Sequence, residues 1–372
     1  MRKAAIAAIA AAAVALTAVP AQAACLPKPN DKALTAALAT VPSADVTGAL
    51  VRITGSAGDW SGTSGYSDTQ SHTPVNPDGL FRIGSATKTF TAVMVLQLAQ
   101  EHRISLDAPV QRYLPGVLPA SYPPVPVYTL LDHTAGLPSV DIPELYNPDW
   151  IIEHRYDHWS PEQVLATATK HPIDFTPGSE QKYTNTAYVT AGMIIQRVTG
   201  RSYADNLRDR IAAPLGLAHT YDPGDDPHLP NPAARGYITN TRGELVDVTE
   251  MNQSIPGAAG AVISTAADLD KFITGLFRGR LLDRPMTNRL FTLPKVKQVD
   301  GTDAAYSQGL MKVTVDGMTV WGKTGSRYGY SSGVFATRDL ARKLIYSVNP
   351  TVKSPDGQPL VVRQIAAAAA AK

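Results

Sequence analysis

The sequence is nearly free of cysteine and of strong charge bias. Cys25 is the only cysteine among 372 residues, so no disulfide can form within the chain and the core alone must stabilise the fold. A net charge of +2 with scattered Lys and Arg argues against a nucleic-acid-binding protein. Beyond the N-terminus no apolar run could span a bilayer, and the Ala-rich run over 366–371 is too short.

The N-terminal segment has the pattern of an export signal. A positively charged start precedes an apolar, Ala-rich run over residues 4–19, and Ala21-Gln22-Ala23 supplies the small residues of a cleavage site. We therefore expect residues 1–23 to be a signal peptide. The mature protein would be secreted to the cell-wall side of the membrane, without a stable membrane span. An uncleaved anchor and a lipid attached to Cys25 remain alternatives.

The order of the predicted elements indicates a mixed α/β fold with one sheet built from both chain ends. The helical middle of the chain would form an insert beside the sheet. We expect a sheet domain from residues 24–95 and 255–372, a helical domain from residues 96–254, and an active site in the cleft between them. The predicted strands are 49–53, 60–66, 318–322, 333–337 and 343–348, and the predicted helices are 31–41, 85–101, 161–169, 186–199, 201–213, 265–276 and one from about residue 360.

A serine and a lysine at helical spacing are the first candidates for chemistry. A serine hydroxyl needs a base to become a nucleophile, and on a helix Lys88 would lie one turn after Ser85, on the same face. Burial would lower the pKa of the lysine and let it accept the proton. Ser179 and Lys182 have the same spacing, but they follow a Pro-Gly loop. Gly84 and the apolar helix that follows favour Ser85 as the nucleophile.

Tyr183-Thr184-Asn185 provides the second candidate pair. In an extended stretch the side chains of Tyr183 and Asn185 point the same way. Tyr183 could pass a proton between Ser85 and a leaving group if a nearby cation stabilises its phenolate, and Asn185 could donate to a substrate carbonyl. The alternative is structural, with Tyr183 as a packing aromatic and Asn185 as the N-cap of the helix over 186–199.

Lys323-Thr324-Gly325 follows a predicted strand and forms the third candidate group. A cation and a hydroxyl suit the recognition of a carboxylate, and Gly325 lets a substrate backbone run close to the strand. The N–H of Ser326 could form an oxyanion hole together with the N–H of Ser85. The alternative is a strand end with an exposed lysine. In the order S-x-x-K, Y-x-N and K-T-G, the three groups would supply nucleophile, proton relay and carboxylate anchor.

With these motifs the chain resembles the serine family of D-alanyl-D-alanine carboxypeptidases and class C β-lactamases, which are penicillin-recognising hydrolases. The likeness covers most of the mature chain and extends well beyond the three motifs. It is carried by Phe81-Arg82-Ile83-Gly84-Ser85-Ala86-Thr87-Lys88, Leu130-Leu131-Asp132-His133-Thr134-Ala135-Gly136-Leu137-Pro138, Pro177-Gly178, Tyr183-Thr184-Asn185, Ala191-Gly192, Pro214-Leu215-Gly216-Leu217, Ala259-Gly260-Ala261-Val262-Ile263-Ser264 and Trp321-Gly322-Lys323-Thr324-Gly325.

The resemblance implies an antiparallel sheet flanked by helices, an all-helical domain and an acyl-enzyme mechanism. Ser85 would attack the penultimate D-alanine carbonyl of a peptidoglycan peptide and release the terminal D-alanine, and β-lactams would acylate the same serine. The residues implied as catalytic are Ser85, Lys88 and Tyr183, and those implied in substrate binding are Asn185, Lys323, Thr324, Gly325 and Ser326.

Departures from the family pattern keep the substrate open. The carboxypeptidase branch often has His where this chain has Lys323, and it can carry a carboxylate-binding Arg where Lys312 follows Gly309-Leu310-Met311. Lys312 or Arg327 could replace that Arg. A β-lactamase, or an esterase for small esters, therefore stays an alternative to the carboxypeptidase. A non-catalytic scaffold is disfavoured because all the expected catalytic residues are present.

The histidines and the glycines give no sign of a metal or nucleotide cofactor. His154 and His158 have helical spacing, but no Glu completes a zinc-binding H-E-x-x-H pattern. His133 is better explained as satisfying backbone groups near a tight Ala-Gly turn. No Gly-rich loop has the spacing of a phosphate cradle. We expect no metal, no cofactor and a monomer.

Overall fold

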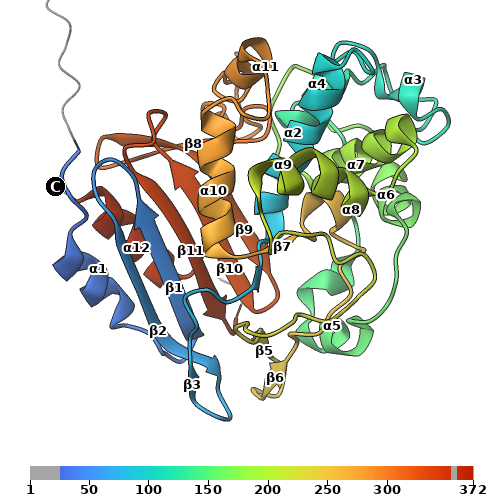
Figure 1. Cartoon of the computed structure of the whole chain (residues 1–372). Helices are drawn as coiled ribbons and strands as arrows, with labels where there is room; N and C mark the ends of the chain where they lie inside the picture. Colours follow the sequence, from blue (N-terminus) through green and yellow to red (C-terminus); the bar gives the residue numbers. More distant parts are fainter. Residues whose placement is uncertain (1–25, 353–357, 372) are drawn as a thin grey trace, which may run out of the picture.

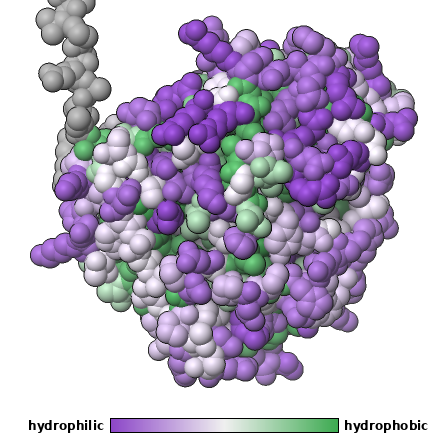
Figure 2. All heavy atoms as spheres, viewed as in Figure 1, coloured by the Kyte–Doolittle hydropathy of each residue, from purple (hydrophilic) through white to green (hydrophobic). Residues whose placement is uncertain are grey.

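A computed structural model describes residues 26–352 and 358–371. The predicted export signal over 1–23, and Cys25, lie outside the described residues. Within the described part of the chain, no helix is long and apolar enough to cross a membrane. On the face shown in Figure 2, hydrophilic side chains predominate and hydrophobic ones surface only in small patches.

A seven-stranded antiparallel sheet is the centre of the fold, in the order β3-β2-β1-β11-β10-β9-β8 (Figure 1). The N-terminal strand β1 pairs with the C-terminal strand β11, so both chain ends do build one sheet, as predicted. The strands of this sheet are β1 (Val46–Thr54), β2 (Trp60–Asp68), β3 (Thr73–Pro74), β8 (Met311–Val315), β9 (Met318–Arg327), β10 (Tyr330–Ala336) and β11 (Lys343–Pro350).

Helices cover both faces of the sheet. The terminal helices α1 (Asp31–Leu38) and α12 (Leu360–Ala370) pack on each other and share an apolar core with β1 and β11. On the opposite face, α10 (Ala266–Phe277) packs on β10 and β11, and α2 (Thr87–Gln100) contacts β9 (Figure 1). Thirteen of the fourteen residues of α2 are buried, which explains its largely apolar sequence.

The middle of the chain is mainly helical and lies beside the sheet, around α2 (Figure 1). It also contains a short hairpin of β5 (Tyr237–Thr239) and β6 (Leu245–Asp247), so the predicted helical segment is not purely helical. The remaining helices are α3 (Val110–Tyr113), α4 (Val127–Leu131), α5 (Pro148–His154), α6 (Pro161–Thr169), α7 (Asn185–Thr199), α8 (Tyr203–Leu207), α9 (Ala213–Leu215) and α11 (Arg284–Arg289). Short turns of helix are η1 (Gly84–Ala86), η2 (Pro143–Tyr146), η3 (Arg208–Ala212) and η4 (Gly257–Ala259), and β4 (Phe81–Arg82) pairs with β7 (Ile263–Ser264).

The predicted elements are present, but several boundaries differ. The helix predicted over 201–213 is divided into α8, a π-helical turn and α9. The division into two domains stays a prediction, and its boundary after residue 95 falls inside the continuous helix α2. The mixed α/β architecture with a helix-flanked antiparallel sheet is confirmed.

Candidate active site

Ser85 lies at the point where a tight turn enters the buried helix α2. Ser85 belongs to η1, which is one turn of 3-10 helix, rather than to the first turn of an α-helix. The α-helix α2 follows directly from Thr87. Gly84 has φ 52°, and a Cβ atom there would lie 2.6 Å from the backbone N of Ser326. Glycine is therefore required at position 84, because any side chain would push the turn away from β9.

Lys88 is buried directly behind Ser85 and has three polar neighbours. Its Nζ lies 3.1 Å from Ser85 Oγ, 2.7 Å from Asn185 Oδ1 and 2.8 Å from the carbonyl oxygen of Ala259. A neutral amine has two N–H bonds and one lone pair. When the two oxygens of Asn185 and Ala259 accept the N–H bonds, the lone pair faces the Ser85 hydroxyl, as a general base requires.

The surroundings of Lys88 favour that neutral form. Only 1% of Lys88 is exposed, and burial lowers its pKa well below the usual value for lysine. The positive charges of Lys323 and Arg327 lower the pKa further. Among the described residues no carboxylate contributes to this shift, so the loss of hydration that disfavours the ammonium form is not offset by an opposite charge.

Tyr183 lines the same cleft as Ser85, and the side chain of Ser85 is near enough to affect the pKa of its hydroxyl. Two lysines flank its ring, with Lys88 Nζ 5.0 Å and Lys323 Nζ 4.8 Å from the ring centroid. Burial nevertheless raises the pKa of Tyr183 above its usual value, and the nearby side chain of Ser85 only partly offsets this. Tyr183 is therefore a phenol in the resting protein, rather than the phenolate considered from the sequence.

His133 and Tyr306 fix the orientation of the Tyr183 ring. The centroid of the Tyr183 ring lies 4.4 Å from that of His133 and 5.3 Å from that of Tyr306. His133 has φ 63°, and its Nδ1 accepts the N–H of Thr184 at 3.3 Å, which is the backbone role predicted for it. Burial and the charges of Lys88 and Lys323 lower the pKa of His133 well below the usual value, so the ring is neutral.

Asn185 is not the N-cap of α7, which was the structural alternative for this residue. Helix α7 starts at Asn185, and its N-cap is Thr184, whose side chain accepts the N–H of Thr186 at 3.2 Å. Asn185 is consequently not the cap. Its amide oxygen binds Lys88 and its side chain lines the cleft, so its amide nitrogen can face a substrate.

The K-T-G segment lies inside strand β9, not after its end as predicted. β8 pairs with β9 only from Met318 to Gly322, so from Lys323 onward one edge of β9 has no neighbouring strand among the residues that the structure describes. Lys323 is 4% exposed, and burial lowers its pKa to about 7. Its Nζ donates to the carbonyl of Thr324 at 3.2 Å and lies 5.7 Å from the Tyr306 ring centroid.

The next three residues of β9 differ in their surroundings. Gly325 packs on the turn before the nucleophile, since a Cβ there would lie 1.8 Å from the carbonyl oxygen of Ile83. Ser326 is exposed and lines the same cleft as Ser85. Thr324 lines an apolar cavity between the sheet and α12, so the substrate-binding role implied for its hydroxyl stays a prediction.

A cleft of about 550 Å³ has Ser85, Tyr183 and Asn185 among its lining residues. None of the described residues that line it is Asp or Glu, and the cation among them is Arg327. The Nε atom of Arg327 donates to Gln253 Oε1 at 3.0 Å, and burial lowers the pKa of the guanidinium to about 10. With Arg327 in its lining and Lys323 next to Tyr183, the cleft suits a substrate that carries a negative charge.

Sequence reasoning missed Gln181, which joins the segment before Tyr183 to the segment that carries Tyr306. Gln181 is fully buried, and its Nε2 donates to the carbonyls of Asp132 and Tyr306 at 2.7 and 2.8 Å. Its Oε1 accepts the N–H of Ala305 at 2.8 Å. A glutamine two residues before the Y-x-N motif gives no signal for this role without coordinates.

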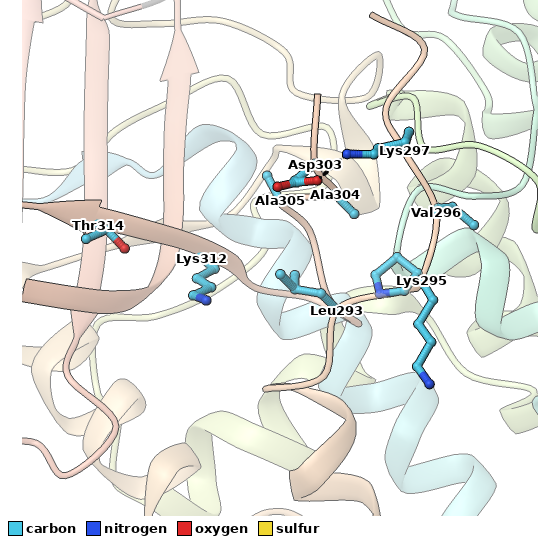
Figure 3. Close-up of a pocket in the computed structure, with 10 residues that line it drawn as sticks. Leu293, Lys295, Val296, Lys297, Asp303, Ala304, Ala305, Lys312 and Thr314 are labelled. Atoms are coloured by element: carbon cyan, nitrogen blue, oxygen red, sulfur yellow. Dashed lines mark hydrogen bonds and ion pairs between the residues drawn. The ribbon is translucent and has the colours of Figure 1, made fainter. Parts of the chain in front are cut away.

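A larger hollow of about 610 Å³ lies elsewhere, between the outer strand β8 and the segment that precedes it (Figure 3). It has Lys295, Lys297 and Lys312 in its lining, and Lys297 pairs with Asp303 at 2.6 Å. None of the predicted catalytic residues lines it. Lys312, considered from the sequence as a carboxylate anchor, lies here rather than in the cleft of Ser85, whereas Arg327 does line that cleft.

The second S-x-x-K match does not form a catalytic pair. The Ser179 hydroxyl donates to the carbonyl of Thr176 at 2.8 Å, and Lys182 Nζ pairs with Asp174 at 2.7 Å. His154 and His158 contact different carboxylates, Asp157 and Asp225 respectively. In the described part of the chain, no group of three or more His, Cys, Asp or Glu side chains could hold a metal ion.

Comparison with known proteins agrees with this geometry. A family model described as Beta-lactamase matches residues 20–369. Among solved structures, a D-stereospecific amidohydrolase from Streptomyces sp. is 36% identical with a TM-score of 0.79, covering 91% of this chain and 98% of that one. A D-amino acid amidase from Ochrobactrum anthropi SV3, in complex with L-phenylalanine amide, is 28% identical with a TM-score of 0.77, covering 91% and 96%.

Curated sequences include a teichoic acid D-alanine hydrolase from Staphylococcus aureus. It is 29% identical over 226 residues, which are 61% of this chain and 53% of that protein. The chain therefore spans about half the length of the curated relatives that it matches.

Proposed function

The chain belongs to the Beta-lactamase family of penicillin-recognising serine hydrolases, and from this premise we propose that it cleaves the bond after a D-amino acid through an acyl-enzyme on Ser85. The leading substrate is a D-alanyl-D-alanine peptide that loses its terminal D-alanine. One observation carries the proposal. Both N–H bonds of the buried Lys88 amine have acceptors, so its lone pair faces the nucleophile.

In the first half of the reaction, Ser85 Oγ bonds to the carbonyl carbon and its proton passes to Lys88 Nζ. The backbone N–H groups of Ser85 and Ser326 would donate to the oxyanion, which the close packing of Gly84 on Ser326 supports. The scissile C–N bond then breaks. Lys88 returns the proton through the Tyr183 hydroxyl to the leaving amine, and an ester to Ser85 remains.

In the second half, a water molecule attacks the ester carbonyl and loses a proton along the same route. The acid is released and Ser85 Oγ recovers its hydrogen, so no external reactant besides water is needed. Removing the general base lowers such rates by about 10² to 10⁴-fold.

The charge of the cleft supports a substrate with a carboxylate beside the scissile bond. Lys323 lies next to Tyr183, and Arg327 is a further cation on the same strand. A free D-amino acid amide would instead bring a protonated amine into a cleft whose described lining contains no carboxylate. This contrast favours a D-alanyl-D-alanine peptide, or a β-lactam that mimics it, over a free amino acid amide.

A second candidate is the hydrolysis of D-amino acid amides or esters. It is favoured by the likeness to the Streptomyces D-stereospecific amidohydrolase, which extends over 91% of this chain. In this case the neutral amine form of the substrate would bind, because a positive charge is disfavoured next to Lys323 and Arg327.

A covalent label tests the shared acyl-enzyme step. We expect a fluorescent penicillin to add to Ser85, located by mass spectrometry of the digested protein. Ser85→Ala should abolish the adduct, whereas the matched Ser179→Ala should leave it unchanged because Ser179 belongs to the non-catalytic S-x-x-K match. An adduct that persists in Ser85→Ala would refute the mechanism.

Substrate comparison separates the candidates. D-alanine release from N-acyl-D-alanyl-D-alanine, ammonia release from D-alanine amide and β-lactam clearance should be measured as kcat/KM on one preparation. The carboxypeptidase proposal expects the largest value for the first substrate. We also propose export from the cell, which N-terminal sequencing of the secreted protein would test by a start after Ala23.

A further inference from the structure

One wall of the cleft of Ser85 is apolar and aromatic, and none of the described residues that line the cleft is a lysine. Tyr146 stands at its rim with 76% of its surface exposed, although it is one of the larger hydrophobic side chains. The other apolar lining residues on this side are Leu145, Pro148, Ile151, Ile238 and Tyr328. These residues come from η2, α5, β5 and the turn after β9, which are separate parts of the chain.

The wall is preformed rather than loosely placed. The Tyr328 hydroxyl donates to the carbonyl of Leu145 at 2.8 Å, which joins the turn after β9 to η2. Ile151 and Ile238 belong to one buried apolar cluster, against which Leu145 and Tyr328 pack. Since protein contacts already fix the part of the wall below Tyr146, a ligand would not have to order that part on binding.

The direction of β9 decides which part of a substrate meets this wall. Lys323, the proposed carboxylate anchor, comes first along the open edge of β9, and Ser326 follows beside Ser85. A substrate whose carboxylate lies at Lys323 therefore extends toward Arg327 and Tyr328 with its acyl part. The group next to Tyr146 and Tyr328 would be the one that precedes the D-residue acylating Ser85.

The size and polarity of this region indicate the chemistry of that group. A single D-alanine methyl group leaves most of a 550 Å³ cleft empty. An ammonium side chain would lie against Leu145, Ile151 and Ile238 without an oppositely charged partner. A carboxylate could meet Arg327, but only by leaving the apolar residues of the wall in contact with its charge. An apolar ring would instead be removed from water between Tyr146 and Tyr328.

We infer that the group preceding the scissile D-residue of the substrate is aromatic or bulky and apolar, and that Tyr146 selects for it. This inference rests on the proposed function, because it uses the acyl-enzyme on Ser85 and the carboxylate end at Lys323. It goes further in naming an acyl-side subsite and its chemistry. A charged peptide stem would be a poor occupant of the same subsite.

Two substrates that differ only in the acyl group test the inference. N-phenylacetyl-D-alanyl and N-acetyl-D-alanyl thioesters of mercaptoacetate share the D-alanyl group and the carboxylated leaving group. We expect the wild-type protein to prefer the phenylacetyl substrate by about tenfold in kcat/KM, the scale of discrimination by apolar contacts. Tyr146→Ala should reduce the preference to about twofold or less, by raising KM for the phenylacetyl substrate only.

The matched control is Tyr156→Ala. Tyr156 is also exposed, at 49%, and follows α5 but does not line the cleft, so this variant should keep the wild-type preference. The inference would be overturned if the wild type had equal kcat/KM for the two substrates, or if Tyr146→Ala kept the wild-type preference. In either case, turnover of the acetyl substrate would still support the proposed function. Failure to turn over either substrate, with no penicillin adduct on Ser85, would overturn both.

Discussion

Gly325→Ala should separate the two backbone segments that form the catalytic centre. The added Cβ would lie 1.8 Å from the carbonyl oxygen of Ile83, whereas ordinary contact begins near 3.4 Å, so a gap of about 1.6 Å must open. Neither side can yield cheaply, because the obstacle is backbone and the Ile83 carbonyl also accepts the Ser332 hydroxyl at 2.8 Å. The shift would separate Ser326 from the turn that carries Ser85.

The expected effect on rate follows from this displacement. A misplacement of about 1 Å at reacting groups can cost about 10²-fold, so we expect acylation by a fluorescent penicillin to slow by at least about 10²-fold. Overpacking should also lower the free energy of unfolding by about 1–3 kcal/mol. Second-order acylation rates from gel fluorescence, and urea unfolding followed by circular dichroism, measure the two quantities.

Gly62→Ala is the matched control for Gly325→Ala. A Cβ at Gly62, on β2, would lie 2.7 Å from the Trp60 ring and 2.9 Å from the Leu38 side chain, far along the sheet from Ser85. It should lose stability but keep the wild-type acylation rate. If Gly325→Ala acylates as fast as the wild type, the close approach of β9 is not what positions the nucleophile.

Three further outcomes are expected. For a carboxylate substrate, kcat/KM should rise with pH as Lys88 loses its proton, and should fall again above about pH 7, because Lys323 has its pKa there and loses its positive charge. A neutral ester should show the rise without the fall. If both substrates show the fall, Lys323 does not bind the carboxylate. Tyr183→Phe should lower kcat about 10²-fold with little change in melting temperature, because the ring contacts remain; an unchanged kcat would exclude the relay. Gln181→Leu should lower the free energy of unfolding by about 3 kcal/mol or more, because it leaves buried amide and carbonyl groups near Tyr306 without partners. If the variant unfolds in urea at the same midpoint as the wild type, this expectation is wrong.

The sequence predicted the architecture well because its signals are local. The apolar helix after Ser85 and the strands at both chain ends are visible as patterns of apolar residues in the sequence. The spacing of Ser85 and Lys88 also anticipated their contact at 3.1 Å. The expectation of a monomer stays a prediction.

What the sequence could not supply depends on contacts between distant segments. β9 continues through the K-T-G motif because β10 pairs with it, and nothing in the ten residues of β9 indicates that partner. Thr184 rather than Asn185 caps α7, because the Asn185 side chain is bound by Lys88 from another helix. The pKa shifts of Lys88 and Tyr183 arise from burial, which no single motif encodes.

Because strands from both chain ends form one sheet, the catalytic centre can assemble only after the C-terminal strands have been synthesised. The hydrogen bond from Ser332 to Ile83 joins residues 249 positions apart, and β11 inserts beside β1 as one of the last strands to be synthesised. A nascent or truncated chain that ends before β9 would carry an intact S-x-x-K segment with no strand to face it. Penicillin labelling would therefore report completed, full-length molecules, and premature acyl transfer during synthesis would be prevented by topology alone.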